Sequence, residues 1–116
     1  MDPGTRACVA YVVGCVILGS ASHQVFDKAR GLHIQMKGSI QGTTVEILDY
    51  ERNCKCMGTL PTLFEFGTNT PITLEIRGRS FFGRDRKSDQ FFGGAVEGGE
   101  VKVHDYRDAK DYFYTL

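Results

Sequence analysis

The stretch Gly38-Ser-Ile-Gln-Gly-Thr-Thr-Val-Glu-Ile-Leu-Asp-Tyr50 decides the fold, because it returns 56 residues later as Gly94-Ala-Val-Glu-Gly-Gly-Glu-Val-Lys-Val-His-Asp-Tyr106. Five positions are identical in the two segments, and apolar residues recur at two more. A period of about fifty residues fits a duplicated supersecondary unit. We therefore predict two related three-stranded units, with a first copy at about residues 33–60 and a second at about residues 89–116.

Regular alternation of apolar and polar residues surrounds this repeat. Ile34, Met36 and Ile40 fall on one face of a strand that begins near residue 33, with polar residues between them. The same period holds at residues 72–76, and no long window after residue 21 has a helical period. Seven or eight short strands separated by turn residues predict a single all-β domain over residues 22–116, folded as a small antiparallel sandwich or barrel.

An Asp-Tyr pair ends the second strand of each copy, at Asp49-Tyr50 and at Asp105-Tyr106. A carboxylate at the end of a strand can accept hydrogen bonds from backbone N–H groups of the turn that follows. A tyrosine there can pack its ring and keep its hydroxyl in water. We therefore assign these pairs to structure.

The N-terminal segment has the pattern of a secretory signal peptide. Arg6 precedes an apolar run at residues 7–18, and the small residues after it fit cleavage following Ala21. The run is shorter than the about 20 residues of a membrane span, and Cys15 follows Val-Val-Gly, as in a lipoprotein acylation site. The expectation is a cleaved signal over residues 1–21 and a secreted, periplasmic or envelope protein. An uncleaved anchor, a lipoprotein acylated at Cys15 and a buried N-terminal helix or strand are the alternatives.

Cys54 and Cys56 are the cysteines that signal removal would leave. Two residues apart in a strand, they point to the same face, and two cysteines cannot form the disulfide framework of a small secreted domain. The sequence favours buried thiols over an intramolecular disulfide or a metal site, because none of the three histidines has ligand spacing. We predict no metal and no cofactor.

Charge is balanced over the chain, with 14 Lys and Arg against 14 Asp and Glu, so no net field attracts nucleic acid or an anionic membrane. The segment Arg77–Lys87 departs from this balance, with five basic residues, one aspartate and two phenylalanines. Basic residues bind phosphates, and exposed aromatic rings stack on unpaired bases. A long β-hairpin with solvated arginines explains the same residues without a ligand. The candidate ligand-binding residues of this hairpin are Arg77, Arg79, Phe81, Phe82, Arg84 and Arg86.

The chain contains no catalytic motif: Gly-x-Ser-x-Gly, a P-loop, His-Glu-x-x-His and a dinucleotide-binding loop are all missing. A small hydrolase could assemble Glu75, Arg77 and His104 from separate strands, but their spacing does not require it.

A calcium loop needs alternating ligands, a glycine and a bidentate glutamate. Three aspartates spaced three residues apart lack this pattern; they are Asp105, Asp108 and Asp111.

The function that the sequence predicts is a small exported, non-enzymatic β-domain that binds a ligand or a partner protein, or serves as a structural component. A polyanion or nucleic-acid binder acting through Arg77–Lys87 is the alternative, and a small secreted hydrolase is the second alternative. No integral membrane domain would remain after signal removal. Exposed sheet edges would permit a homodimer formed by strand pairing.

Overall fold

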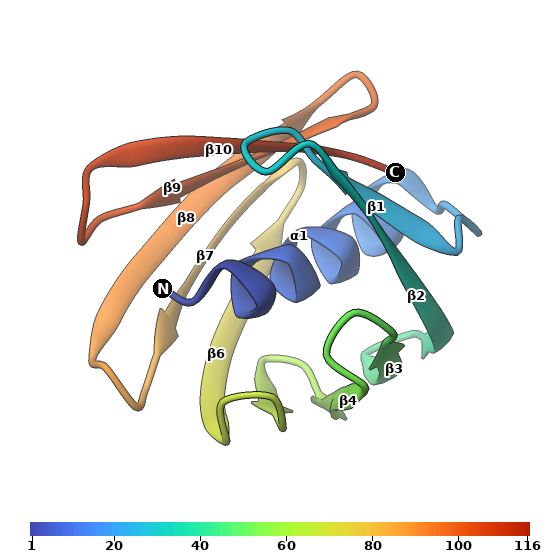
Figure 1. Ribbon diagram of the computed structural model, residues 1–116, viewed down its shortest axis with the longest axis horizontal. Coiled ribbons are helices and arrows are strands. Elements are labelled where there is room, and N and C mark those ends of the chain that lie inside the picture. Colours follow the sequence, from blue (N-terminus) through green and yellow to red (C-terminus); the bar gives the residue numbers. More distant parts are fainter.

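In the computed structural model, which describes residues 1–116, ten antiparallel strands form a closed barrel around one α-helix (Figure 1). The helix, α1, is Pro3–Leu18. The strands are β1 (Gln24–Asp27), β2 (Leu32–Gln41), β3 (Thr44–Asp49), β4 (Cys54–Thr59), β5 (Thr62–Glu65), β6 (Thr70–Arg77), β7 (Ser80–Asp85), β8 (Gln90–Glu97), β9 (Glu100–Asp105) and β10 (Lys110–Thr115). Each strand pairs with its neighbours in chain order, and β10 pairs with β1 to close the barrel.

Helix α1 has a defined beginning and end. The Asp2 carboxylate accepts hydrogen bonds from the backbone N–H groups of Gly4 and Thr5 at 3.0 and 3.1 Å, and Pro3 occupies the first helical position. Gly19 ends the helix in the left-handed conformation, with φ of 62°. From Ala7 to Leu18 the helix carries no charged residue and is apolar on all sides, as expected for a helix that is buried all round.

The apolar run that predicts a signal peptide thus lies at the centre of the barrel (Figure 1), as in the alternative of a buried N-terminal helix. Eleven successive residues of α1, from Gly4 to Gly14, are buried. Cleavage after Ala21 and acylation of Cys15, which is half-buried in α1, stay predictions.

One core joins α1 to the inner faces of the strands. On α1 it comprises the buried residues 7–13. The strands contribute Val25, Ile34, Met36, Val45, Ile47, Cys56, Leu63, Ile72, Leu74, Phe81, Phe92, Val96, Val101, Val103 and Tyr114. A barrel of this size leaves an interior that side chains of the strands alone do not fill, and α1 occupies that interior.

The fold is therefore a barrel, and the prediction of seven or eight strands is wrong by the two strands β1 and β7. Four-residue β1 is too short to show a period. The inward positions of β7 are Phe81, Gly83 and Asp85, so only one of the three is large and apolar. Gly83 makes room for Phe92, because a Cβ at Gly83 would lie 2.5 Å from the Phe92 ring. The segment Arg77–Lys87 is consequently not one long hairpin but β7 with a turn at each end.

The two sequence copies occupy β2–β4 and β8–β10. Their matched glycines share a structural reason. Gly38 and Gly94 have φ of 140° and 157°, and a Cβ at these positions would lie 2.0 and 1.8 Å from a backbone carbonyl oxygen of the neighbouring strand. Only glycine fits where two strands approach so closely. A common origin of the two copies stays a prediction.

Candidate functional site

Every odd-numbered strand ends in a buried carboxylate at one end of the barrel. Each carboxylate accepts a hydrogen bond from a backbone N–H group two or three residues later, and the residue four positions after it has positive φ. We call these five segments the acid turns; their acids are Asp27, Asp49, Glu65, Asp85 and Asp105. The predicted role of Asp49 and Asp105 in their turns is confirmed. The other three acids, Asp27, Glu65 and Asp85, lie outside the two aligned copies, so the repeat did not predict their role. The signal that could have found them is an acid followed four residues later by Gly, Asn, Asp or Ala.

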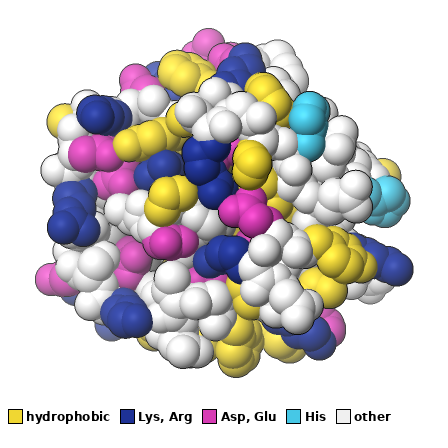
Figure 2. All heavy atoms as spheres, in the orientation of Figure 1, with side chains coloured by type: hydrophobic (Ala, Val, Ile, Leu, Met, Phe, Trp, Pro, Cys, Tyr) yellow, Lys and Arg dark blue, Asp and Glu magenta, His cyan; other side chains and the backbone are white.

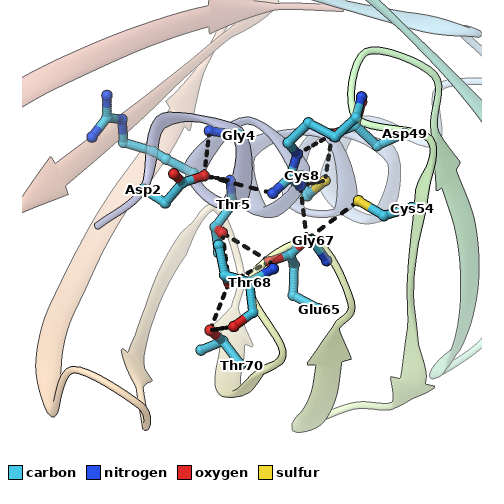
Figure 3. A network of polar contacts seen from close by, with 12 residues as sticks. Asp2, Gly4, Thr5, Cys8, Asp49, Cys54, Glu65, Gly67, Thr68 and Thr70 are labelled. Carbon is cyan, nitrogen blue, oxygen red and sulfur yellow. Dashed lines mark hydrogen bonds and ion pairs between the residues drawn. The ribbon is translucent and has the colours of Figure 1, made fainter.

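Glu65 is the centre of a polar network at the N-terminal end of α1 (Figure 3). One carboxylate oxygen accepts hydrogen bonds from Arg52 and from the Gly67 N–H group, both at 2.8 Å. The other accepts from the hydroxyl groups of Thr5 at 2.9 Å and Thr68 at 2.7 Å. Because Thr5 belongs to α1, the network ties the helix to the acid turn after β5.

Burial and hydrogen bonding decide the charges in this network. Burial alone would raise the pKa of Glu65, but hydrogen bonds from Thr68, Gly67 and Thr5 and the positive charge of Arg52 outweigh burial and hold that pKa below its usual value. Burial raises the pKa of the Cys8 thiol well above its usual value, although Arg52 Nη2 lies 3.2 Å from the sulfur. The network therefore combines an ionised carboxylate with a neutral, inert thiol, and this combination anchors α1 rather than supplying a nucleophile.

Cys54 and Cys56 lie two residues apart on β4, and both are free thiols. Cys56 is buried in the core, and the Cys54 sulfur lies 3.6 Å from the Glu65 carboxylate. Burial is the main cause that raises the pKa of Cys54 to about 11 and that of Cys56 to about 12. Both thiols are protonated at neutral pH, which suits packing.

A cluster of exposed aromatic side chains lies on the outer surface of β7 and β8 and at the end of β9. Phe82, Phe91 and Tyr106 are 50, 57 and 64% exposed. Together with Gly83 and Phe92 they line a shallow hollow of about 420 Å³. We call Phe82, Phe91 and Tyr106 the aromatic patch. Large apolar groups gathered in this way on a surface mark a site of interaction more often than isolated ones do.

The two arginines nearest the aromatic patch are already paired with carboxylates. The Arg84 guanidinium lies 5.6 Å from one ring centre of the patch, and its Nε donates to Asp89 at 2.6 Å. The Arg77 guanidinium lies 5.9 Å from another ring centre and 3.6 Å from the Glu75 carboxylate. Acidic and basic side chains are likewise interspersed over the face drawn in Figure 2. Each of the two arginines that border the patch therefore has a carboxylate beside it.

Three of the six predicted ligand-binding residues lie at this patch. Phe82 belongs to it, and Arg77 and Arg84 border it. Sequence reasoning missed Phe91 and Tyr106, because they come from the next strand and the turn after β9. The backbone N–H of Tyr106 donates to the carbonyl of Phe91 at 3.2 Å, which brings the two side by side.

The other three predicted residues are placed elsewhere. Phe81 points into the barrel and is only 4% exposed, so its ring contacts the core. Arg79 donates to the backbone carbonyl groups of Val96 and Gly98 at 2.9 and 3.2 Å and thereby braces the β8–β9 turn. Arg86 is exposed in the turn after β7.

Of the residues considered for hydrolysis, Arg77 and Glu75 lie 3.6 Å apart, but His104 is not brought to them. Glu75 pairs across strands with Phe82, Phe82 with Gly93, and Gly93 with His104. Glu75 and His104 are thus three strands apart, or roughly 14 Å at the usual spacing. His104 Nδ1 instead lies 2.7 Å from the Asp111 carboxylate.

The three aspartates considered for calcium also diverge. Asp105 is buried inside the barrel. Asp108, in the turn after β9, accepts a hydrogen bond from Tyr112 of β10, and Asp111 pairs with His104 on the outside.

The comparisons with known proteins add no identification. The chain matches no protein-family model, and no curated protein and no solved structure is significantly similar to it. No helix has both the length and the apolar character needed to cross a bilayer.

Proposed function

We propose that this protein is a non-enzymatic binding module and that the aromatic patch is its contact surface for a partner protein. The observation that carries the proposal is the exposure of three large aromatic rings side by side on the outside of a barrel whose interior is already filled. Helix α1 occupies the interior that larger barrels leave open for a ligand, which directs binding to the outside.

The composition of the patch fits a protein interface. Aromatic residues and arginine are enriched in protein interfaces, and buried aromatic anchors contribute most of the binding free energy. Phe82 and Phe91 present flat apolar faces, and Arg84 can extend the contact over its edge. Their rigid attachment to β7 and β8 keeps the entropy cost of ordering these rings low.

Charge argues for a protein partner over a polyanion. A nucleic-acid surface collects phosphates with unpaired Lys and Arg side chains. Here Arg84 and Arg77 are countered by Asp89 and Glu75, and Arg79 is used by backbone carbonyl groups. Binding to nucleic acid through this segment remains the alternative, supported by exposed Phe82 beside the arginines.

Site-specific photocrosslinking in the native host tests the proposal. A crosslinking residue in place of Ser80, which lies two positions from Phe82 on the same face of β7, should give a discrete adduct with one partner. The same residue in place of exposed Glu46 on β3 is the control and should not.

The partner so identified is then measured with purified protein. The double variant Phe82→Ser, Phe91→Ser should bind at least roughly 30-fold more weakly, because loss of an aromatic hot spot costs about 2 kcal/mol or more. Phe66→Ser, which removes an equally exposed ring outside the patch, should bind like the wild type. Equal affinity of the double variant and the wild type would sink the proposal. Binding of an oligonucleotide that Arg84→Glu abolishes would favour the alternative.

Export and self-association are further parts of the predicted function. Export by cleavage after Ala21 would remove α1 from the core, so it is an alternative to the intact barrel and not an addition to it. The intact mass of the protein from its native host tests it, because cleavage would give a chain beginning at Ser22. A homodimer by strand pairing requires a strand with a free edge, and in this barrel every strand has two partners. Light scattering of the wild type and of the double patch variant would show whether a dimer forms and whether it uses the patch instead.

A further inference from the structure

The aromatic patch lies on strands that cannot accept another strand. β7 pairs with β6 and β8, and β8 pairs with β7 and β9. The backbone N–H and C=O groups beneath the rings are therefore bonded within the sheet. Peptides that add a strand to a sheet need a free edge, and none is present at the patch. A partner must contact the patch through its side chains.

The rings of the patch are separate platforms. Phe82 pairs directly with Gly93, and Phe91 comes two residues earlier on β8, so the two phenylalanines are diagonal neighbours about 7–8 Å apart. Tyr106 lies across from Phe91, whose carbonyl accepts a hydrogen bond from its backbone N–H group. No two of the three rings stack on each other. The hollow of about 420 Å³ beside them is open to side chains of a partner.

Hydrogen-bond donors without an acceptor border these rings. Tyr106 is 64% exposed and its hydroxyl has no partner in the chain, while its ring is held edge-on by His104 with 4.6 Å between ring centres. Arg84 donates to Asp89 through Nε and Nη2, which leaves Nη1 free. The exposed Arg77 guanidinium lies 3.6 Å from its nearest carboxylate oxygen, too far for a good hydrogen bond. A ligand that matches this border must supply acceptors.

The conformation of the partner segment decides whether it can supply them. An α-helix uses its carbonyl groups in its own hydrogen bonds, so its side offers few acceptors to these donors. A polyproline II helix has no internal hydrogen bonds, and its carbonyl groups are free. With three residues per turn and 3.1 Å per residue, prolines three positions apart lie on one edge about 9 Å from each other. That distance is close to the spacing of Phe82 and Phe91.

Charge at the patch excludes the acidic and phosphorylated peptides that clusters of unpaired arginines recognise. Arg77 already lies beside the Glu75 carboxylate. Arg84 is likewise paired with Asp89. Both carboxylates would repel an acidic peptide, whereas an uncharged peptide encounters no such repulsion.

We infer that the partner contacts the aromatic patch through a proline-rich segment in the polyproline II conformation. Two prolines three residues apart pack on Phe82 and Phe91, and a carbonyl group of the segment accepts a hydrogen bond from the Tyr106 hydroxyl. A proline-rich segment suits aromatic platforms because its conformation is formed before binding and little entropy is lost. This inference rests on the function proposed for the patch and adds the chemistry of the ligand.

Titration of the ¹⁵N-labelled full chain with blocked nonaproline, followed by NMR, tests the inference. The wild type should bind with a dissociation constant of about 1 mM or lower, and the largest shifts should fall on residues of the patch. A nonapeptide of alternating L- and D-proline has the same composition but cannot form the polyproline II helix. It should bind at least about ten times more weakly.

Three variants locate the binding. Tyr106→Phe removes one hydroxyl and keeps the ring, so it should weaken nonaproline binding by a factor of about 2–10. The double variant Phe82→Ser, Phe91→Ser should weaken it at least roughly tenfold. Phe66→Ser, outside the patch, should bind nonaproline like the wild type. Equal binding of the two peptides, or nonaproline binding that neither patch variant weakens, would overturn the inference.

Failure of this inference can be told apart from failure of the proposed function. Mass spectrometry of the adduct formed at Ser80 identifies the partner segment, which should contain prolines three residues apart. A discrete adduct with a segment that lacks proline, or no binding of nonaproline by the wild type, would overturn the inference and leave the patch as a contact surface. The absence of both an adduct and nonaproline binding would overturn the two together.

Discussion

Substitution of Glu65 by glutamine should destabilise the barrel strongly, although the two side chains have nearly the same shape. Glu65 is fully buried. Its Oε1 accepts a hydrogen bond from the backbone N–H group of Gly67, and its Oε2 accepts one from that of Thr68. An amide can offer an oxygen to only one of them, so its NH₂ group must oppose the other donor. The Arg52 guanidinium, 2.8 Å away, loses one of its buried counter-charges as well.

The expected loss is about 3–5 kcal/mol, the usual cost of removing one partner from a buried ion pair. This is a large part of the about 5–15 kcal/mol that holds a small domain together. Urea unfolding followed by circular dichroism measures the difference. Glu75→Gln, at a partly exposed carboxylate whose one ion pair is with Arg77, should change the free energy of unfolding by less than about 0.5 kcal/mol and is the matched control. A loss below about 1 kcal/mol in Glu65→Gln would refute the reasoning.

The pH dependence gives a second test of the same residue. The pKa of Glu65 is lower in the folded protein than its ordinary value of 4.5, because its hydrogen bonds and Arg52 outweigh burial. The unfolded chain therefore binds the proton more readily, and the stabilisation is present above pH 4.5 and is lost as the pH falls through the folded pKa. Wild-type stability should fall in acid below that pH, and Glu65→Gln should lack this part of the fall.

Two further changes test the barrel itself. Gly94→Ala should lower the free energy of unfolding by about 3 kcal/mol or more, because its Cβ would lie 1.8 Å from a carbonyl oxygen. Gly98→Ala, in an open turn with φ of 58°, should lower it by about 1–2 kcal/mol. Equal urea midpoints of the two variants would contradict the close strand approach. A chain beginning at Ser22 lacks α1 and should bind a hydrophobic dye and unfold without a cooperative transition. Cooperative unfolding at the wild-type midpoint would show that α1 is not needed to fill the core.

Much of the β-structure could be predicted because alternation is a local property of the chain. Residues 34–40 and 72–76 alternate visibly, and they form parts of β2 and β6. The choice between sandwich and barrel could not be made, because it depends on whether the first and last strands meet. The position of α1 could not be predicted either. A helix surrounded by apolar side chains on all sides needs no polar face, so it has the same composition as the apolar part of a signal peptide.

The candidate sites could not be predicted from the order of residues, because they depend on which strand face a side chain occupies and on which strands pair. Phe81 and Phe82 are adjacent in sequence, yet one ring is in the core and the other in solvent, because successive residues of a strand face opposite sides. Phe91 and Tyr106 join Phe82 only through the pairing of neighbouring strands.

The closing pair of strands has a consequence for how the protein is made. β1 and β10 come from opposite ends of the barrel sequence and share only the pairs Phe26 with Thr115 and Asp27 with Tyr114. The ribosome releases α1 first and β10 last, and at about 5–20 residues per second the interval between them is several seconds or more. During that time the apolar helix has no complete barrel to enclose it. Nascent chains of this protein should therefore depend on a chaperone that shields the apolar residues of α1 until β10 has left the ribosome.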